Sequence, residues 1–389
     1  MSEHRRRSAI AAAAALALAL PGAAMADNSS RDHGASGRWL GIPVDAAKYV
    51  GRQAAAAPGW TVAATGLDNP RQLVWANHSL IVAEAGHGSY KADNCVGAGH
   101  DQFCFGRSGQ VSFVRRPAVA TAQQPQSLVK GLLSGAGPDG SFALGADGAD
   151  FAGGALYIAM AAVRPPASMP GIPGQQAGKL LKASSITGEK RIYADIARFE
   201  KRHNPDGEEI DSNPYAVLTL ARRQLVADAA ADAILQVRNG RVSVWAVLPE
   251  LGKRVDAVPT SITKGPDGRI YVGGLGSEIP GDGAVYQFNR RGRLLGTIAG
   301  FSTVTGVAVS ERGTIFVSEL FGGDADNGFP GAVVRVSPNL QKRHAFSVPF
   351  PAGLVVHRGT LYVNAYSVST AKGSFGPDTS GQVWRRTLG

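Results

Sequence analysis

The amino-acid sequence predicts an all-β fold, a six-bladed β-propeller, because one strand pattern returns about six times along the chain. In each repeat an extended stretch and a turn lead to a branched-aliphatic or aromatic triplet, and another strand follows after a loop. The last four triplets begin 46, 45 and 46 residues apart, with no amphipathic helix between them. A period near 45 residues that is built from strands is typical of a propeller. The triplets begin at Leu80, Leu156, Gln224, Ile270, Ile315 and Leu361.

Residues 1–26 have the features of a cleaved signal peptide. Three arginines, Arg5–Arg7, precede the apolar stretch Ser8–Leu20, and Ala24-Met25-Ala26 is a cleavage motif. Thirteen residues are too few to cross a bilayer core, so we expect no stable membrane span. Sec and twin-arginine export both remain open. The predicted location is secreted or periplasmic.

The domain boundaries follow from where the strand pattern begins. Residues 27–58 are polar and then Ala-rich, and we interpret them as a flexible leader with one short helix near Val44–Ala55. Residues 59–389 are the predicted propeller, a single domain long enough to bury roughly three quarters of its unfolded surface. The strand Trp60–Thr65 has no blade of its own, and the sixth blade ends after Gln382–Thr387 without an outer strand. Pairing these two segments would close the ring and remove an exposed edge.

The fourth and fifth blades have the clearest pattern. The fourth is predicted to have strands at Thr260–Lys264, Arg269–Gly273, Ala284–Asn289 and Leu294–Ala299, and the fifth repeats this order. The second blade carries a Pro-rich insertion, Arg164–Gly178. The third is preceded by a helix-like stretch, Asp195–His203, with Asp195 as its N-cap. Six is the preferred number of blades, and seven is the alternative.

Two cysteines, Cys95 and Cys104, lie in the exported part of the chain. Oxidising compartments favour pairing them, so we predict a disulfide rather than free thiols. A metal site would need further Cys or His ligands at a suitable spacing, which the sequence does not provide.

The net charge of +10 comes from Lys and Arg residues that are dispersed and lack interleaved aromatic side chains. This pattern does not favour nucleic acid as a partner. The positive charge suits either an acidic envelope polymer or simple solubility.

Several short phrases form a specific set when they are taken together. They are Thr65–Arg71, Val82–Gly86, the loop from Cys95 to Gly106, Asn204–Gly207 leading to Glu209–Tyr215, Val226–Ala229 and Val258–Ser261. As a set they resemble the ScyD/ScyE family of exported proteins. The resemblance covers the chain from about Trp60 to the C-terminus. It implies a propeller and brings no established reaction. The sequence departs from the family near Gly145–Phe151, where a site histidine is absent.

The long insertions are expected on one face of the propeller, and the opposite face is expected to carry only tight turns. Three carboxylates, Glu84, Asp228 and Glu319, follow the second strands of alternate blades. If these side chains point toward the axis, they form an acidic rim whose mutual repulsion favours a bound cation. Oxygen-only ligands suit Ca²⁺ or Mg²⁺. In the alternative, Glu84 pairs with Arg71, and Asp228 holds a turn through the backbone.

Other polar residues are candidates for ligand binding. Asp150, Asp211 and Asn213, expected ahead of inner strands, could join the rim, as could Asn364. Asp211, Asn213 and Tyr215 form the densest polar cluster and are either a pocket wall or a turn that organises the third blade. Arg71 completes the predicted binding set. Asp324–Gly328 favours Asx turns rather than a calcium loop, because the required Glu is missing.

The preferred function is an exported scaffold that binds a small molecule or an envelope or extracellular protein on its loop-rich face, without catalysis. The motivating observation is that long loops occur without a complete catalytic constellation. The alternative is a metal-dependent hydrolase similar to lactonase or strictosidine-synthase-like propellers, with a divalent cation in the central pore. A quinone-dependent sugar dehydrogenase ranks last, because no convincing cofactor set of His, Arg and Lys is present.

Overall fold

The computed structural model describes residues 36–39, 42–45 and 56–389, apart from 120, 252–254, 277–279 and 323–329. The predicted signal peptide, most of the leader and the segment Asp324–Gly328 lie outside the described residues. The predicted leader helix also lies outside them, except for Val44 and Asp45. These two residues belong to strand β2 (Ile42–Asp45), which pairs with β1 (Ser36–Trp39).

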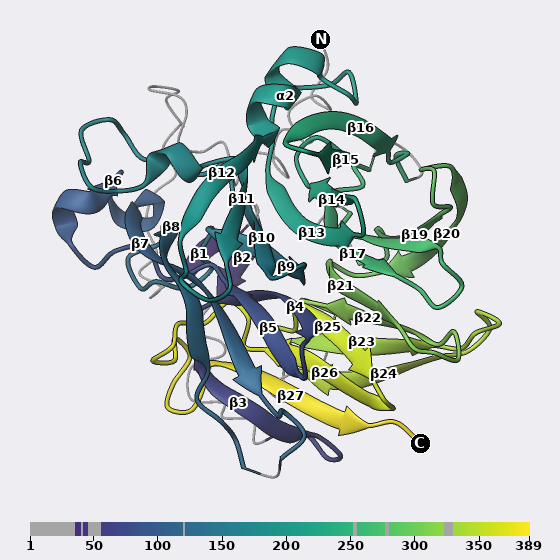
Figure 1. The fold of residues 1–389 in the computed structure, drawn as a ribbon. Coiled ribbons are helices and arrows are strands. Elements are labelled where there is room, and N and C mark those ends of the chain that lie inside the picture. Colours follow the sequence, from purple (N-terminus) through teal and green to yellow (C-terminus); the bar gives the residue numbers. More distant parts are fainter. Residues whose placement is uncertain are drawn as a thin grey trace, which may run out of the picture.

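Six antiparallel sheets of four or five strands surround a common centre, which confirms the six-bladed propeller (Figure 1). Blade 1 holds β4 (Pro70–Ala76), β5 (Ser79–Glu84), β6 (Cys95–Val96), β7 (Phe103–Arg115) and β8 (Gln126–Ala136). Blade 2 holds β9 (Ala146–Ala152), β10 (Ala155–Met160), β11 (Lys179–Ser184) and β12 (Lys190–Asp195). Blade 3 holds β13 (Pro214–Leu220), β14 (Arg223–Asp228), β15 (Ala233–Arg238) and β16 (Arg241–Val247).

The last three blades follow the same plan. Blade 4 holds β17 (Pro259–Lys264), β18 (Ile270–Gly274), β19 (Gly283–Phe288) and β20 (Leu294–Phe301). Blade 5 holds β21 (Val304–Val309), β22 (Ile315–Glu319), β23 (Gly331–Val336) and β24 (Arg343–Val348). Blade 6 holds β25 (Leu354–His357), β26 (Thr360–Ala365), β27 (Gly381–Thr387) and β3 (Thr61–Leu67).

The two ends of the domain close the ring as predicted. Strand β3 pairs antiparallel with β27 (Figure 1). In this pairing Gly381 lies opposite Leu67. The free edge of β3 is covered as well, because Gln123 exchanges backbone hydrogen bonds with Ala63 and Thr65 at 2.9 and 3.1 Å. Covering an edge in this way blocks unwanted pairing with another chain.

Helical structure is sparse. The one α-helix in the described part of the chain is α2 (Ile196–His203), and short 3₁₀ turns lie at Ala92–Asn94, Gly99–Asp101 and Gly174–Gln176. The Asp195 side chain accepts a hydrogen bond from Arg198 N at 3.0 Å, which confirms the predicted N-cap. Asn204 ends the helix in the left-handed conformation. No helix among the described residues has the length and hydropathy needed to cross a membrane.

The connections divide the propeller into two faces. We call one the loop face; it carries the links from second to third strands and from blade to blade, such as residues 85–102, 161–178 and 366–380. We call the other the turn face; it carries short hairpin turns such as residues 77–78, 153–154 and 239–240. The expectation that this second face has only tight turns fails at residues 116–125, which join β7 to β8 and contain the Gln123 bridge to β3.

The largest hydrophobic cluster lies between the sheets of blades 3 to 6 and includes Trp60, Tyr286, Phe350 and Trp384. Smaller clusters fill the spaces between the other blades. Trp60, just before β3, packs at 6.2 Å from Trp384 of β27, measured between ring centroids. The closing strand is therefore held by aromatic packing as well as by its ladder of backbone bonds.

Polar side chains tie each blade to another blade in the ring. Four of them come from inner strands, whereas Asn364 lies in the second strand β26 and Asp232 in the link from β14 to β15. Each contacts backbone of another blade or of the loop that leads into it. The ties are Arg71 to Ala143 O, Asp150 to Thr219 N, Asp232 to Val258 N, Thr260 to Val304 O, Thr305 to Pro351 O and Asn364 to Arg71 O.

Glycine permits the close approach of blades 6 and 1. Gly353 N donates to Arg71 O at 3.0 Å. A Cβ at position 353 would lie 2.4 Å from both Arg71 O and Leu73 N, which are backbone atoms that cannot move aside cheaply. This contact completes the ring on the axis side, opposite the outer β27–β3 pairing.

We expect Gly353→Ala to lower the free energy of unfolding by about 1–3 kcal/mol, because the added methyl group pushes two inner strands apart. Urea unfolding should show a lower midpoint with an unchanged slope. Gly296→Ala is the matched control, since Gly296 lies in the outer strand β20 with no atom within 4 Å of the added Cβ. Equal midpoints for the two variants would contradict this account of the ring.

Candidate functional site

The carboxylates predicted as an acidic rim are each tied within their own blade. Glu84 Oε2 accepts a hydrogen bond from Asp68 N at 2.7 Å, and Gln110 Nε2 donates to Glu84 Oε1 at 3.0 Å. Asp228 accepts from Asn213 N at 2.5 Å and from the Ser212 hydroxyl at 2.7 Å. The alternative in which Asp228 holds a turn through the backbone therefore matches the structure.

Glu319 has the same role in blade 5, where its Oε1 accepts from Ser302 N at 2.8 Å. Each carboxylate stands at the end of a second strand, opposite the first residue of the inner strand, and binds the backbone just before that strand. Across the described ranges, no three His, Cys, Asp or Glu side chains are grouped so that they could hold a metal ion. Glu84, Asp228 and Glu319 therefore do not share one site, and these three residues do not carry the prediction of Ca²⁺ or Mg²⁺.

Burial changes the acidity of these groups. Removal from water raises the pKa of Glu84 and of Asp228 to about 7, although the hydrogen bonds that they accept act in the opposite direction. Desolvation likewise raises the pKa of Asp147 and of Asp232 to about 7. The pKa of Glu319 is raised by the same cause.

A central cavity of about 220 Å³ lies among the six inner strands. Three of the predicted binding residues line it: Arg71, Asp150 and Tyr215. Its other polar residues include Gln72, Thr260, Thr263, Lys264 and Thr305. The inner strands are buried where they begin and become partly exposed where they end, at the turn face. The cavity therefore opens toward the turn face and away from the long insertions.

Asp150 lies inside the inner strand β9, whereas the sequence interpretation placed it ahead of an inner strand. Its Oδ2 accepts a hydrogen bond from Thr219 N of blade 3 at 2.6 Å, and its Oδ1 accepts from Phe151 N at 2.8 Å. Burial raises the pKa of Asp150 to about 6. Gln72 similarly binds both the N–H and the C=O of Val217. These side chains satisfy the backbone of β13 as a neighbouring strand would.

Arg71 is also engaged in the structure. Its guanidinium donates to the carbonyl oxygens of Ser367 and Ala143, and its Nε lies 3.8 Å from Asp147 Oδ1. The predicted alternative of an ion pair with Glu84 is replaced by this buried pair. Asn364 Nδ2 donates to Arg71 O at 2.6 Å, so two of the predicted binding residues are in contact. Burial raises the pKa of the neighbouring Tyr215 to about 12.

Asp211 and Asn213 lie on the loop face, between α2 and β13, and neither lines the central cavity. Asp211 Oδ1 accepts from Ser212 N at 2.7 Å, and Asn213 Oδ1 accepts from Ala162 N at 3.4 Å. The predicted polar set is therefore divided between the cavity and the connection that leads into blade 3.

The loop face of blade 1 holds a pair that the sequence interpretation did not assign, Asp68 and His87. His87 Nδ1 lies 2.5 Å from Asp68 Oδ2, and the imidazole stacks on Tyr90 with 4.8 Å between ring centroids. Asp68 is buried, His87 is 31% exposed, and Tyr90 is 57% exposed. The signal that could have found the pair is the position of both residues beside Glu84, one before β4 and one after β5.

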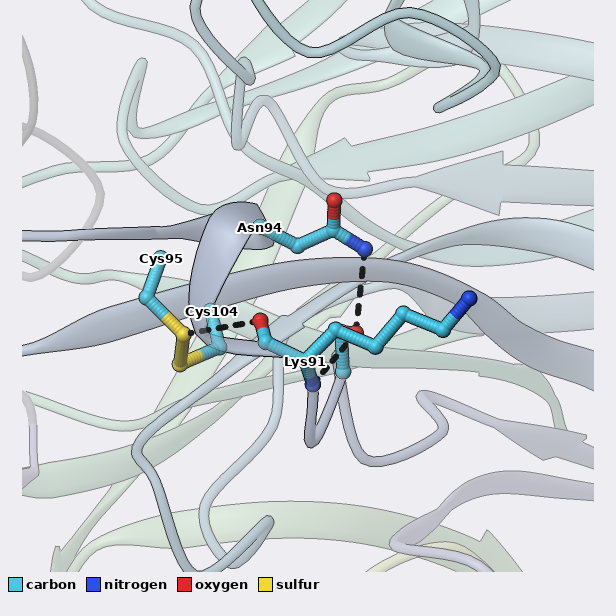
Figure 2. The surroundings of a disulfide bond; sticks show 5 residues. Lys91, Asn94, Cys95 and Cys104 are labelled. Carbon is cyan, nitrogen blue, oxygen red and sulfur yellow. Dashed lines mark hydrogen bonds between the residues drawn. A yellow bond between two sulfur atoms is a disulfide. The ribbon is translucent and has the colours of Figure 1, made fainter.

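The loop that carries His87 and Tyr90 is held from several sides. The predicted disulfide Cys95–Cys104 is present and links neighbouring positions of β6 and β7 (Figure 2). The Ser89 hydroxyl accepts from Lys91 N and Asn94 Nδ2, each at 3.1 Å. His87 N and Gly88 N donate to the hydroxyls of Ser108 and Ser134, both at 2.9 Å. These bonds anchor the exposed aromatic side chain to the rigid blade.

The solved structures that resemble this chain do so at low sequence identity. No protein-family model matches it, and no curated protein matches it either, so the resemblance to the ScyD/ScyE family is not confirmed. A structural genomics protein of unknown function from Bacteroides thetaiotaomicron is 9% identical, with a TM-score of 0.48, covering 88% of this chain and 73% of that chain. A gluconolactonase from Xanthomonas campestris is 10% identical, with a TM-score of 0.48 and coverages of 85% and 89%.

A third similar structure is a nidogen/laminin complex, at 12% identity and a TM-score of 0.45, covering 72% of this chain and 95% of that chain. With identities of 12% or less and TM-scores below 0.5, these three structures carry no argument about this chain. Function has to be argued from the residues of this chain.

The raised pKa values predict that stability falls as the pH rises. Glu84, Asp147, Asp228 and Asp232 bind protons in the folded state up to about pH 7, whereas in the unfolded chain they release them near pH 4. The folded state therefore holds more protons between these values. Each such group removes up to about 1.4 kcal/mol of stability per pH unit as the pH rises through this window.

Urea unfolding from pH 5 to pH 8 measures this effect, and we expect the midpoint to decrease. Asp147→Asn carries no charge at any of these pH values, so its midpoint should depend less steeply on pH. A wild-type midpoint that stays constant or rises over this range would show that the buried carboxylates remain ionised.

Proposed function

We propose that this chain is an exported propeller that captures a small molecule or an envelope or extracellular protein on its loop face, without catalysis. The observation that carries the proposal is Tyr90, an exposed aromatic side chain that stacks on His87, whose imidazole contacts the buried Asp68. Exposed tyrosine on a rigid support is a common anchor of binding surfaces, because it offers a large contact area at low entropic cost.

The preorganisation of the loop supports this proposal. The disulfide and the serine hydroxyls around residues 87–95 hold the ring pair before any partner arrives. Gly88 lies against the backbone, since a Cβ there would be 2.1 Å from Cys104 O. A rigid surface loses little conformational entropy on binding, so more of the contact energy contributes to affinity.

The chemistry around Tyr90 suggests what a partner presents. Burial, together with the nearby carboxylates of Asp68 and Asp139, raises the pKa of Tyr90, so its phenol stays neutral and able to donate a hydrogen bond. A Cβ at Gly140 would lie 2.9 Å from both the Tyr90 hydroxyl and His87 Cβ, which places the link between β8 and β9 against the ring pair. Carboxylates beside an aromatic face suit a partner with cationic or hydroxyl groups.

The resemblance of Thr65–Arg71 and Val82–Gly86 to the ScyD/ScyE family supports the same proposal. The first phrase contains Asp68, and His87 directly follows the second. Membership of that family is part of the proposal. Export is also part of it and agrees with the disulfide, since oxidising compartments favour such bonds.

The second candidate is a hydrolase, and the contact between His87 and Asp68 is the observation that favours it. A carboxylate that binds Nδ1 of histidine leaves Nε2 free to take a proton from water, which is the arrangement of a general base. An ester or lactone bound beside Tyr90 would be the substrate class. A divalent cation remains part of this candidate, with Ca²⁺ or Mg²⁺ supplying carbonyl polarisation when bound.

For the binding proposal, we expect Tyr90→Ala to weaken partner capture at least tenfold, a loss of about 1.4 kcal/mol. The measurement is affinity capture by the purified chain from an envelope extract of the producing organism, with bound proteins and small molecules identified by mass spectrometry. Ile186→Ala is the control, because Ile186 is 92% exposed on the turn face. Equal recovery by both variants would contradict a binding surface at Tyr90.

For the hydrolase candidate, we expect His87→Gln to lower kcat/KM at least about 100-fold on esters or lactones that the wild-type protein cleaves. Activity is assayed with a panel of both substrate types, with and without added Ca²⁺ or Mg²⁺. His344→Gln removes an exposed histidine from the outer strand β24 and should leave activity unchanged. Wild-type protein without activity on the panel, or full activity of His87→Gln, would reject this candidate.

A further inference from the structure

The connection between blades 2 and 3 buries a carboxylate without any partner. Glu200 lies in α2 with an exposed fraction of 0%, and neither of its carboxylate oxygens has a hydrogen-bond partner in the described part of the protein. Burying an ionised carboxylate without compensation is strongly unfavourable. Glu200 therefore needs an explanation that its protein neighbours do not supply.

Two more oxygen atoms on this connection are buried and unpartnered, Asn204 Oδ1 and Asp211 Oδ2. The Asn204 amide is oriented by its Nδ2, which donates to Glu208 O at 2.8 Å, so its oxygen is left as a bare acceptor. Asp211 uses only Oδ1, which accepts from Ser212 N. Four acceptor atoms thus lack donors within twelve residues of the chain.

Several other carboxylates lie near enough to Glu200 to repel its negative charge. Asp228, Asp206 and Asp211 all act on Glu200 by repulsion. The basic residues of α2 do not compensate, because Arg198, Lys201, Arg202 and His203 are all exposed to solvent. The ion pairs formed by the described residues leave Glu200, Asp206 and Asp211 unpaired.

Protonation alone would not resolve this arrangement. One proton on Glu200 turns one of its oxygens into a donor, but it leaves the other Glu200 oxygen, Asn204 Oδ1 and Asp211 Oδ2 with at most one donor among them. A cation bound among Glu200, Asn204 and Asp211 would satisfy these acceptors and offset the repulsion. Carboxylate and amide oxygens without nitrogen or sulfur are the ligands of a hard cation, and Ca²⁺ tolerates irregular geometry better than Mg²⁺.

We infer that a Ca²⁺ ion binds between α2 and β13, with Glu200, Asn204 and Asp211 as its side-chain ligands. Asp206 and Asp228 add negative charge around it. One of the three side-chain ligands is an amide, so the site differs from a cluster of three acidic or His side chains. Backbone carbonyls and water would complete a shell of six to eight oxygens.

The consequence is structural and lies on the loop face. The ion would join the last turn of α2 to the chain that leads into β13, so it would hold the helix against blade 3. This inference is independent of the surface at Tyr90 on blade 1, and its test does not require a binding partner of that surface.

The test is thermal unfolding and calorimetric titration of the purified full chain, first treated with EDTA and then titrated with CaCl₂. We expect saturating Ca²⁺ to raise Tm by about 5 °C, as mass action predicts for an ion that binds only the folded state. Glu200→Gln should raise the Kd for Ca²⁺ at least tenfold. Glu189→Gln, which changes an exposed glutamate on the turn face, should bind Ca²⁺ like the wild type.

The two readings of Glu200 give opposite results. If Glu200 is simply protonated, Gln replaces it without loss, and Ca²⁺ changes neither Tm nor the heat of titration, which would overturn the inference. An equal Kd for Mg²⁺ would overturn the choice of Ca²⁺. Should Glu200→Gln fail to fold, Asp211→Asn takes its place, and the wild-type titration by itself decides whether the ion binds.

Discussion

The whole structure depends on joining six inner strands into a closed ring without leaving their backbone groups unsatisfied. An inner strand has a neighbour on one side only, and its other edge faces the axis. Buried N–H and C=O groups on that edge need partners. Short polar side chains supply many of them across the junctions, and the buried Arg71 joins blade 1 to the loops before blade 2 and after β26.

This constraint explains the contacts of most polar residues that the sequence predicted as ligand or metal sites. Asp150, Asn364 and Arg71 were candidates for ligand binding because they are polar residues close to the axis. In the structure they are bonded to backbone of neighbouring blades. Glu84, Asp228 and Glu319 bind the chain just before an inner strand, so their carboxylates are used within the blade. The centre of this propeller is thus organised mainly for its own stability.

Candidates for function therefore lie where polar or aromatic side chains are not used to join the blades. Two places on the loop face meet that description. At blade 1, the pair of His87 and Tyr90 is exposed and rigid because the disulfide and the serine hydroxyls fix its loop. At the start of blade 3, acidic and amide oxygens are buried without donors. Both lie in connections between strands, which tolerate insertions without disturbing the ring.

Much of the fold follows from the sequence alone. The period near 45 residues predicted the blades, and three of the four strands predicted for blade 4 differ from the observed bounds by one residue at one or both ends. Because the sequence gives blade 6 no outer strand of its own, the pairing of β3 with β27 was also predicted. Asp195 was correctly assigned as an N-cap and Cys95–Cys104 as a disulfide, because each interaction joins residues that are close in sequence.

Tertiary structure alone decided where the polar side chains point. Glu84 at a strand end can lean toward the axis or bind its own blade, and the pattern of residues does not distinguish these states. The partner of Arg71 is Asp147 rather than Glu84, and Asp68 meets His87 across a gap of 19 residues. Strand periodicity is a local property that the chain carries in its spacing, whereas side-chain partners depend on the register of strands that are distant in sequence.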